Sequence, residues 1–303
     1  MSIVDISLVI PVYNRSQELR RTLQSLTFST ISPDRFEVII ADDGSSEDIQ
    51  GVLNEFASKF PGHRLKYAYQ PDEGFRVAAA RNLGADQAEG RIIVYNDNGM
   101  VLSSTALERH IAHYDKHGET LVVLANMYAT GWGTNLDRAR EILENNSVDD
   151  AIAIMQAENM TDGRSYMFEP FGVDVDKWYI PWNALWGGHF SVCAEFVKKH
   201  NIRWNESFTS WGGEDNEYGI QLCEAGARLC FCSDVEVAHY PTPGSKAVTG
   251  PDEEFRRNYE LTKQKILSLH PTRSVETWTI IGGGANDPAK RAELFKEKGW
   301  SMS

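Results

Sequence analysis

In the first third of the chain, short apolar runs alternate with segments whose apolar residues recur at helical spacing. The apolar runs, which are typical of strands buried on both faces, lie at 6–10, 36–41, 65–69 and 91–95. Helical spacing follows the first three runs, at 16–26, 49–56 and 77–88. Strands that alternate with helices predict an α/β fold with a Rossmann-like, mostly parallel, doubly wound sheet flanked by helices.

Polar clusters follow the strands of this predicted sheet. They are Asn14-Arg15, Asp42-Asp43-Gly44, Glu73-Gly-Phe-Arg76 and Asn96-Asp97-Asn98. Each cluster alone could be an ordinary turn, because Asp, Asn and Gly favour turn conformations. Parallel strands bring their carboxyl ends to one edge of the sheet, and ligands bind there in folds of this class. Four clusters at one edge therefore predict a binding site.

The pattern changes after residue 102. Two helical stretches, at 136–144 and 148–157, precede an aromatic-rich segment, and we interpret 103–180 as an insertion over the sheet on the acceptor side. Further helices are predicted at 195–199, 215–225 and 253–269, with strands at 228–232 and 235–238. The resulting division is a nucleotide-binding half (1–102), the insertion (103–180), an acceptor and catalytic half (181–245) and a C-terminal helical extension (246–303).

The formal net charge is −13, from 43 acidic and 30 basic residues among 303. Such a surface argues against nucleic-acid and anionic-membrane partners, and an anionic substrate must meet locally placed cations. No window approaches the ~20 apolar residues that span a bilayer, and the first residues do not resemble a signal peptide. The four cysteines stand singly or as Cys-x-Cys in apolar segments, which indicates reduced thiols. We expect a cytoplasmic protein without integral membrane association.

Residues 211–217 read Trp-Gly-Gly-Glu-Asp-Asn-Glu and crowd acids and glycines where no core would place them. Glycine permits positive φ and close approach of a ligand, and an acid at a helix N-terminus is favoured by the helix dipole. The stretch also fits a capped helix start, but a cap explains neither Trp211 nor the adjacent pair Glu214-Asp215. We therefore predict an active-site turn in which a carboxylate acts as a base.

Several short strings resemble a known enzyme family, in the family's order. Those at 10–15, 41–45, 74–84 and around Asp97 resemble the nucleotide-binding half of family-2 glycosyltransferases of the GT-A fold. The strings at 186–191 and 211–217 resemble the acceptor half of β-1,4-galactosyltransferases, polypeptide GalNAc-transferases and bacterial chondroitin polymerases. The resemblance spans about residues 6–239 and implies a glycosyltransferase that uses a nucleoside diphosphate sugar, with UDP preferred.

The resemblance assigns the donor nucleotide to the loops at the sheet edge. Asp43 would accept a hydrogen bond from the base, with Asp42 as its neighbour. The other residues that it implies for the donor nucleotide are Pro11, Val12, Tyr13, Arg15, Arg76, Arg81 and Asn96. Arg81 would present a cationic fork to the diphosphate or to the base edge; alternatively, it forms a surface ion pair with Asp86 or Glu89.

Family members usually carry Asp-x-Asp after the fourth strand, and this chain departs from that pattern. Asp97 stands at the first acid and Gly99 at the second, so one metal ligand is missing. The resemblance still implies a Mn²⁺ or Mg²⁺ site made from Asp97, Asn98 and His239 together with diphosphate oxygens and water. His239 could equally be a satisfied histidine at the end of a strand.

The resemblance also assigns the chemistry. Asp215 matches the catalytic base that deprotonates the acceptor in an inverting displacement, and Glu214 would orient the acceptor or the donor sugar. The residues expected to contact sugar or acceptor are Trp186, Gly187, Gly188, His189, Trp211 and Gly213. His189 could instead simply pack beside its turn.

Two points stay open in the sequence. The missing acid at position 99 leaves the alternative of a nucleotide-sugar-binding module with impaired catalysis. The acceptor could be a sugar, a peptide or a small molecule. A dehydrogenase reading rests on Gly282-Gly-Gly-Ala alone and is weak, because too little chain follows it for a dinucleotide-binding unit.

Overall fold

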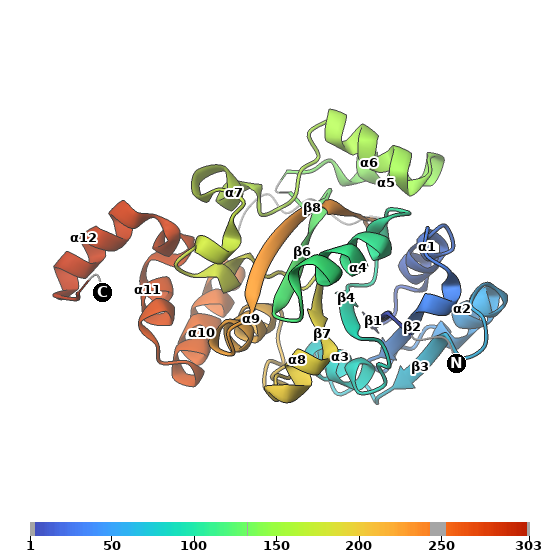
Figure 1. Cartoon of the computed structure of the whole chain (residues 1–303), viewed down its shortest axis with the longest axis horizontal. Coiled ribbons are helices and arrows are strands. Elements are labelled where there is room, and N and C mark those ends of the chain that lie inside the picture. Colours follow the sequence, from blue (N-terminus) through green and yellow to red (C-terminus); the bar gives the residue numbers. More distant parts are fainter. Residues whose placement is uncertain (1–3, 132, 243–252, 302–303) are drawn as a thin grey trace.

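The computed structural model describes residues 4–131, 133–242 and 253–301. Within these residues one eight-stranded sheet crosses the molecule in the order β3-β2-β1-β4-β7-β6-β8-β5 (Figure 1). The strands are β1 (Ile6–Val12), β2 (Phe36–Asp42), β3 (Leu65–Tyr69), β4 (Ile92–Asn96), β5 (Met100–Leu102), β6 (Leu121–Tyr128), β7 (His189–Cys193) and β8 (Arg228–His239). The α-helices are α1 (Ser16–Leu26), α2 (Ile49–Phe56), α3 (Val77–Ala85), α4 (Ala106–His117), α5 (Leu136–Asn145), α6 (Val148–Ala157), α7 (Ser165–Phe171), α8 (Ala194–Lys199), α9 (Glu214–Glu224), α10 (Glu253–Leu269), α11 (Arg273–Ile281) and α12 (Pro288–Lys298).

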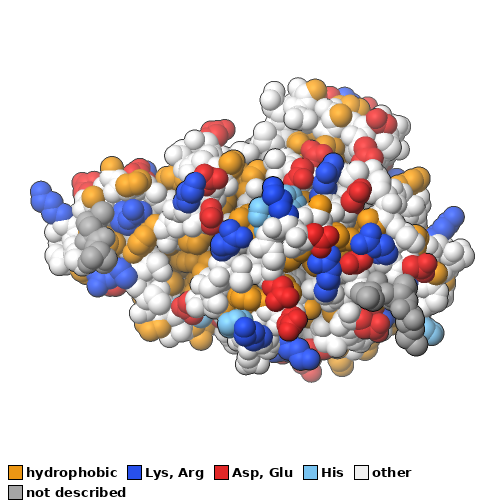
Figure 2. Space-filling view, in the orientation of Figure 1, with side chains coloured by type: hydrophobic (Ala, Val, Ile, Leu, Met, Phe, Trp, Pro, Cys, Tyr) orange, Lys and Arg blue, Asp and Glu red, His pale blue; other side chains and the backbone are white. Residues whose placement is uncertain are grey.

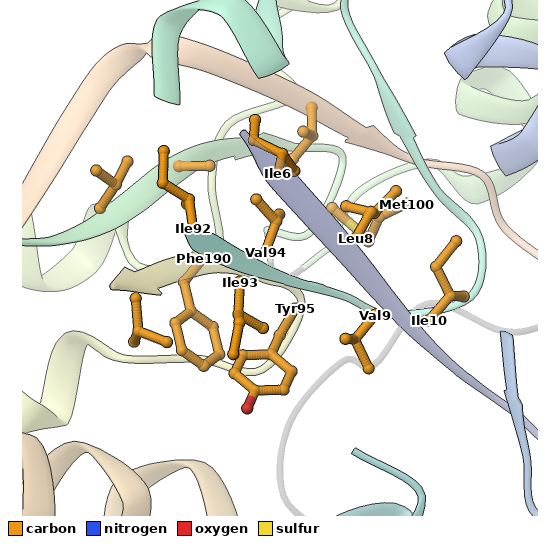
Figure 3. Packing of buried hydrophobic residues seen from close by; sticks show 14 of the residues in the cluster. Ile6, Leu8, Val9, Ile10, Ile92, Ile93, Val94, Tyr95, Met100 and Phe190 are labelled. Carbon is orange, nitrogen blue, oxygen red and sulfur yellow. The ribbon is translucent and has the colours of Figure 1, made fainter. Parts of the chain in front are cut away.

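Strands β3, β2, β1 and β4 form the parallel half of the sheet. Ile6 lies in register with Phe36 on one side and with Ile92 on the other. Apolar side chains fill both faces here, as the close view of Ile6, Leu8, Val94 and Tyr95 shows (Figure 3). Burial on both faces is the reason why β1, β2 and β4 read as apolar runs, whereas β3, at the edge of the sheet, is only partly buried. The predicted α/β class and its first four strands are confirmed.

The second half of the sheet is mixed. Strand β7 runs antiparallel to both β4 and β6, β8 runs parallel to β6, and β5 runs antiparallel to β8. The two short strands predicted between 228 and 238 are one strand, β8, whose pairing with β6 shifts register beside Asn126. Antiparallel pairing is thus confined to the half of the sheet that carries the predicted acceptor motifs.

The predicted insertion at 103–180 is wrong for its first part. Residues 121–128 form β6, which lies between β7 and β8 inside the sheet, and α4 packs against β6 and β8. The buried apolar run that begins at Leu121 makes β6 an interior strand rather than part of a covering segment. Helices α5 and α6 do lie outside the sheet, at the upper right in Figure 1, on a separate apolar cluster that includes Tyr128 and Tyr240.

Helices α10 and α11 form a C-terminal layer whose Ile266 and Trp278 share an apolar cluster with Ile220 of α9, and α12 lies beyond α11 (Figure 1). Trp278 packs edge-to-face on Trp182 with ring centroids 5.2 Å apart, and His270 Nε2 lies 3.0 Å from Glu217 Oε1 on α9. The catalytic helix predicted from the sequence is therefore held between the sheet and this layer. The start of the predicted extension, 246–252, lies outside the described residues.

Across the described residues, no helix is both long and apolar enough to cross a membrane. Cys193, Cys223, Cys230 and Cys232 are free thiols. Burial raises the pKa of Cys223 and of Cys232 to about 12, so neither forms a reactive thiolate at neutral pH.

Candidate active site

The loops after β1 and β2 are bonded to each other at the sheet edge. Asn14 Oδ1 accepts hydrogen bonds from the backbone N–H groups of Ser46, at 2.9 Å, and Glu47, at 3.1 Å. The Glu47 carboxylate in turn accepts from the backbone N–H of Arg15, which has a left-handed φ of 59°. Two of the predicted polar clusters therefore form one connected rim, as expected from the carboxyl ends of parallel strands.

Asp42 and Asp43 have different environments. Asp42 is buried and accepts from Ser45 N at 2.8 Å and from the Tyr67 hydroxyl at 2.6 Å, so it holds the loop in shape. Asp43 accepts from Gln70 Nε2 at 2.6 Å and from Arg76 N at 3.0 Å. Burial raises the pKa of Asp43, and these two hydrogen bonds oppose that rise. A carboxylate has further lone pairs, so Asp43 can still accept from a ligand.

The other residues predicted to bind the donor nucleotide differ in how far they are exposed. Pro11 and Val12 are buried within β1, whereas the Tyr13 side chain is 51% exposed and its hydroxyl donates to Asp72 at 2.9 Å. The guanidinium of Arg76 pairs with Glu73. On the described part of the face in Figure 2, basic and acidic side chains are interspersed and form no broad basic area, so an anionic ligand must use individual cations.

Arg81 does not form the alternative surface ion pair with Asp86 or Glu89, and both ends of its guanidinium fork are paired with acids of the protein. Its guanidinium is almost completely buried, donates to Asp97 Oδ1 at 2.8 Å and to Glu214 Oε1 at 3.1 Å, and lies 4.3 Å from the centre of the Trp204 ring. Burial alone would lower the pKa of Arg81, but Asp97 and Glu214 raise it. Arg81 therefore bridges an acid of the predicted donor edge and an acid of the predicted catalytic turn.

Asp215 occupies the first turn of α9, half-buried next to Glu214. Its Oδ1 accepts from Asn216 N at 2.7 Å and its Oδ2 accepts from Gly187 N at 3.3 Å. Burial and the charge of Glu214 raise the pKa of Asp215 to about 7, while Arg81 and the two backbone donors act in the opposite direction. A carboxylate with a pKa near neutrality is suited to take a proton from a hydroxyl group at physiological pH.

The predicted glycines are required mainly by the protein's own side chains. A Cβ on Gly187 would lie 2.4 Å from Arg81 Nη2, and a Cβ on Gly213 would lie 2.1 Å from Thr262 Cγ2 of α10. Gly188 accepts from Asp97 N at 2.9 Å and so ties the two predicted halves together. Trp211 is 69% exposed at the start of the turn, where its indole can meet a ligand.

Asn96 and His189 do not face a ligand, and we correct their assignment. Both side chains are fully buried, with His189 Nδ1 2.6 Å from Asn96 Oδ1. His189 Nε2 lies 2.9 Å from His110 Nε2, and His110 Nδ1 lies 2.8 Å from Ser191 Oγ. Asn96 Nδ2 donates to the carbonyl of Asp97, so Asn96 Oδ1 accepts from His189 Nδ1. His189 Nε2 can then accept from His110 Nε2, and His110 Nδ1 can accept from Ser191 Oγ, which fits two neutral imidazoles. These residues support the Asp97 loop from behind.

The residues predicted for a metal ion lie at neighbouring positions. Asp97 is 44% exposed at its side chain, and His239 pairs in register with Met100 on the adjoining strand. Asn98 Nδ2 donates to the Arg15 carbonyl at 3.1 Å, while Asn98 Oδ1 is buried without a hydrogen-bond partner among the described residues. An orphaned amide oxygen beside a carboxylate fits the oxygen ligands of a hard divalent cation. Within the described residues, no group of three or more His, Cys, Asp and Glu side chains is arranged to hold a metal ion.

Sequence reasoning missed Trp204 and His110. Trp204 forms the wall behind Arg81, and His110 continues the buried network from α4. Neither residue stands in a recognisable motif, and His110 lies in the segment for which the sequence predicts an insertion. A buried aromatic or histidine with distant partners leaves no local signal in a single sequence.

Comparison with known proteins supplies an independent line of argument. The family model described as glycosyl transferase family 2 matches residues 7–195. The chain is 31% identical over 242 residues to validoxylamine A glucosyltransferase of Streptomyces hygroscopicus subsp. limoneus, covering 78% of this chain and 52% of that protein. It is 30% identical over 281 residues to chondroitin synthase of Escherichia coli, covering 86% of this chain and 38% of that protein. The chain thus spans about half or less of the length of these two relatives.

Solved structures share the fold at lower identity. S. aureus TarS 1-349 in complex with UDP-GlcNAc matches with a TM-score of 0.62 and 20% identity, over 91% of this chain and 70% of that chain. The mannosyltransferase PcManGT from Pyrobaculum calidifontis, in complex with GDP-Man and Mn²⁺, matches with a TM-score of 0.53 and 14% identity, over 95% of this chain and 75% of that chain.

Proposed function

The chain belongs to glycosyl transferase family 2, as predicted, and we propose that it transfers a sugar from a nucleoside diphosphate sugar to an acceptor with inversion of the anomeric configuration. UDP is the preferred nucleotide, which the UDP-GlcNAc complex of a structural neighbour supports. The acceptor nucleophile is a hydroxyl or a related group. The likeness of 211–217 to the acceptor half of galactosyltransferases and chondroitin polymerases stays a prediction.

One observation carries the proposal: Arg81 joins the donor edge to the catalytic turn. Its two hydrogen bonds, to Asp97 and to Glu214, fix the distance between the end of β4 and the start of α9. Asp215 follows Glu214 directly and has a pKa of about 7. One rigid guanidinium thus holds an acid of the donor site and the acid next to the proposed base, which is an arrangement that suits a displacement between donor and acceptor.

The donor nucleotide has a matching place at the rim formed by the loops after β1 and β2. Asp43 can accept from the base, and the exposed ring of Tyr13 offers it an aromatic face. Tyr13, Arg15, Asp43 and Arg76 are the residues that we retain for the nucleotide, because their atoms lie at this rim. Asp42 acts through the shape of the loop.

The reaction separates charge, so it needs a base for the attacking group and positive charge for the leaving group. Asp215 takes the proton from the attacking group. The negative charge of Glu214, which is paired with Arg81, helps to keep the pKa of Asp215 raised. The negative charge of the departing diphosphate develops on the opposite side of the anomeric carbon. Asp97 and Asn98 lie at the end of β4 on the donor side.

We further propose that Asp97, Asn98 and His239 hold Mn²⁺ or Mg²⁺ together with donor oxygens. The ion would supply positive charge toward the leaving diphosphate. With Gly99 in place of an acid, we expect stimulation by Mn²⁺ without an absolute requirement. The rate of nucleoside diphosphate release, measured with Mn²⁺ and with excess chelator, tests this; an unchanged rate in chelator would refute a role for the ion.

The function is tested with Asp215→Asn and with Asp176→Asn as a matched control, since Asp176 is an exposed acid. Donors come from a screen of UDP-, GDP- and dTDP-sugars by thermal shift, because a ligand that binds the native state raises the melting temperature. We expect Asp215→Asn to lower turnover by roughly 10²–10⁴-fold while the shift caused by UDP is retained. Equal turnover by Asp215→Asn and the parent would refute Asp215 as the base. Binding without turnover in the parent would favour a binding module instead.

A further inference from the structure

A small polar cavity opens on the acceptor side of the catalytic turn. Gly131, Gly133 and Thr134, which follow β6, line it together with the segment that leads into α7, and its volume is about 270 Å³. Pockets for larger small-molecule ligands usually have roughly 300–1,000 Å³, so this cavity has room for about one ring of a ligand. The residues assigned above to donor, base and metal do not line it.

The cavity presents neutral hydrogen-bonding groups. Thr134, Asn159, Thr161 and Ser165 line it, and Tyr166, whose side chain is 57% exposed, contributes an aromatic wall. Thr134 Oγ1 donates to the Gly131 carbonyl at 2.6 Å. Within the described part of the chain, the side chains of Asn159, Thr161 and Ser165 form no hydrogen bond, so they are available to a ligand.

Asp162 is the charged residue that lines the cavity, and Arg164 neutralises it. The pair is buried, with Arg164 Nη2 2.6 Å from Asp162 Oδ2. Asp162 Oδ2 also accepts from Met127 N of β6 at 2.9 Å, and Arg164 Nη1 donates to the Ala184 carbonyl at 3.1 Å. The floor of the cavity is therefore anchored to the sheet and has no net charge, so little ordering is needed on binding.

The cavity adjoins the catalytic base through a short path. Gly163, in its lining, packs so closely on the Trp186 indole that a Cβ there would lie 2.7 Å from Cζ3. The next residue, Gly187, donates its N–H to Asp215 Oδ2.

We propose that this cavity is the acceptor subsite and binds one neutral, polyhydroxylated ring, a sugar residue, whose reacting hydroxyl points toward Asp215. The inference rests on the proposed function. Neutral hydroxyl and amide groups match the alternating donors and acceptors of a sugar, and an aromatic wall matches its apolar face. The described residues that line the cavity offer no unpaired cation to an anionic acceptor and no aliphatic side chain that would anchor a peptide.

The test measures two rates with a UDP-sugar donor that is identified by the thermal-shift screen. UDP release in water alone reports the donor site and the base. Transfer to neutral mono- and disaccharides, to glucuronate, to glucose 6-phosphate and to a Ser/Thr peptide reports the acceptor class. We expect neutral saccharides to be preferred at least tenfold in kcat/KM. A tenfold preference for an anionic acceptor or for the peptide would overturn the proposal.

Thr161→Val and Ser165→Ala, together and singly, remove cavity hydroxyls at accessible positions. The double variant should raise the saccharide KM at least tenfold, while its rate of UDP release in water stays that of the parent. Thr120→Val is the matched control, because Thr120 precedes β6 at the end opposite the cavity, about 26 Å away along the strand, and it should behave as the parent. An unchanged saccharide KM in the double variant overturns the acceptor subsite alone. No UDP release by the parent with any donor or acceptor overturns the proposed function itself.

Discussion

Replacing Glu214 by Gln should move the pH dependence of the reaction to lower pH. The charge of Glu214 raises the pKa of Asp215, second only to burial, and Arg81 lowers it. Glu214→Gln removes the negative charge and leaves Arg81 with Asp97 as its one acidic partner. Both changes favour the ionised form of Asp215. The acidic limb of the profile, expected near pH 7 in the parent, should therefore shift downward by about one unit or more.

The size of the effect follows from the ionised fraction of the base. With a pKa of 7, about 9% of Asp215 is ionised at pH 6, and with a pKa of 6 this fraction is about 50%. The assay is kcat/KM for UDP release between pH 5 and pH 9, because this ratio reports the pKa values of the free enzyme. The position of the limb is compared rather than its height, since Glu214 also orients ligands.

A matched control separates the charge of Glu214 from a general loss of acid. Glu224 lies on the same helix, ten residues further along and about 15 Å away, which exceeds the screening length at physiological salt. Glu224→Gln should therefore leave the limb near pH 7. If the acidic limb of Glu214→Gln stays at the pH of the parent or moves to higher pH, the limb does not report Asp215 with a pKa raised by Glu214, and the assignment is refuted.

Three further predictions concern stability. The folded pKa of Asp215, about 7, lies above its ordinary 3.8, so the folded state binds this proton more tightly and the contribution to stability falls as pH rises from 3.8 to 7. Relative to Asp215→Asn, the parent should lose up to about 4 kcal/mol of unfolding free energy between pH 4 and pH 8, measured by urea titration; parallel curves would contradict this. Arg81→Met leaves two acids without their shared cation and should cost about 3–5 kcal/mol at pH 7 in the same assay, whereas a loss below about 1 kcal/mol would show that the bridge is not structural. Burial lowers the pKa of His189 to about 3 and that of His110 well below 6.5. As the pH drops below 6.5, both histidines are protonated in the unfolded chain before they are protonated in the folded protein, so the free energy of unfolding falls. Replacing both histidines by Gln should make this acid slope shallower by up to about 2.7 kcal/mol per pH unit, and an identical slope would contradict the neutral network.

The sequence predicts the parts of the fold whose signals are local. Strand β3 has the predicted bounds Leu65–Tyr69, and α10 ends at the predicted Leu269, because the apolar run and the helical spacing end there at clear breaks. Strand β7 gave no such signal. It begins with His189 and contains Ser191, two polar residues whose burial depends on His110 of α4, about 80 residues earlier in the chain.

The candidate site shows the same limit. The motifs around Asp43, Asp97 and Asp215 could be located from their strings, and the structure brings the last two together through Arg81. The partners of Arg81 could not be read from the sequence, because Asp97 lies 16 residues away and Glu214 lies 133 residues away. A search for nearby acids points to Asp86 instead, which pairs with Arg203. Long-range ion pairs are fixed by the topology of the sheet, and only the folded chain reveals them.

Gly99 and Arg81 together account for the departure from Asp-x-Asp. Gly99 has a φ of +98°, and a Cβ there would lie 3.3 Å from the carbonyl oxygen of Tyr240, so both conformation and space disfavour an aspartate. Arg81 lies 2.8 Å from Asp97, the remaining acid of the motif. The guanidinium also pairs with Glu214, so it neutralises part of the charge of both acids, and Asp97 attracts a divalent cation less strongly than two unpaired acids would. The partial dependence on Mn²⁺ that we predict is therefore a consequence of the chain's own charges.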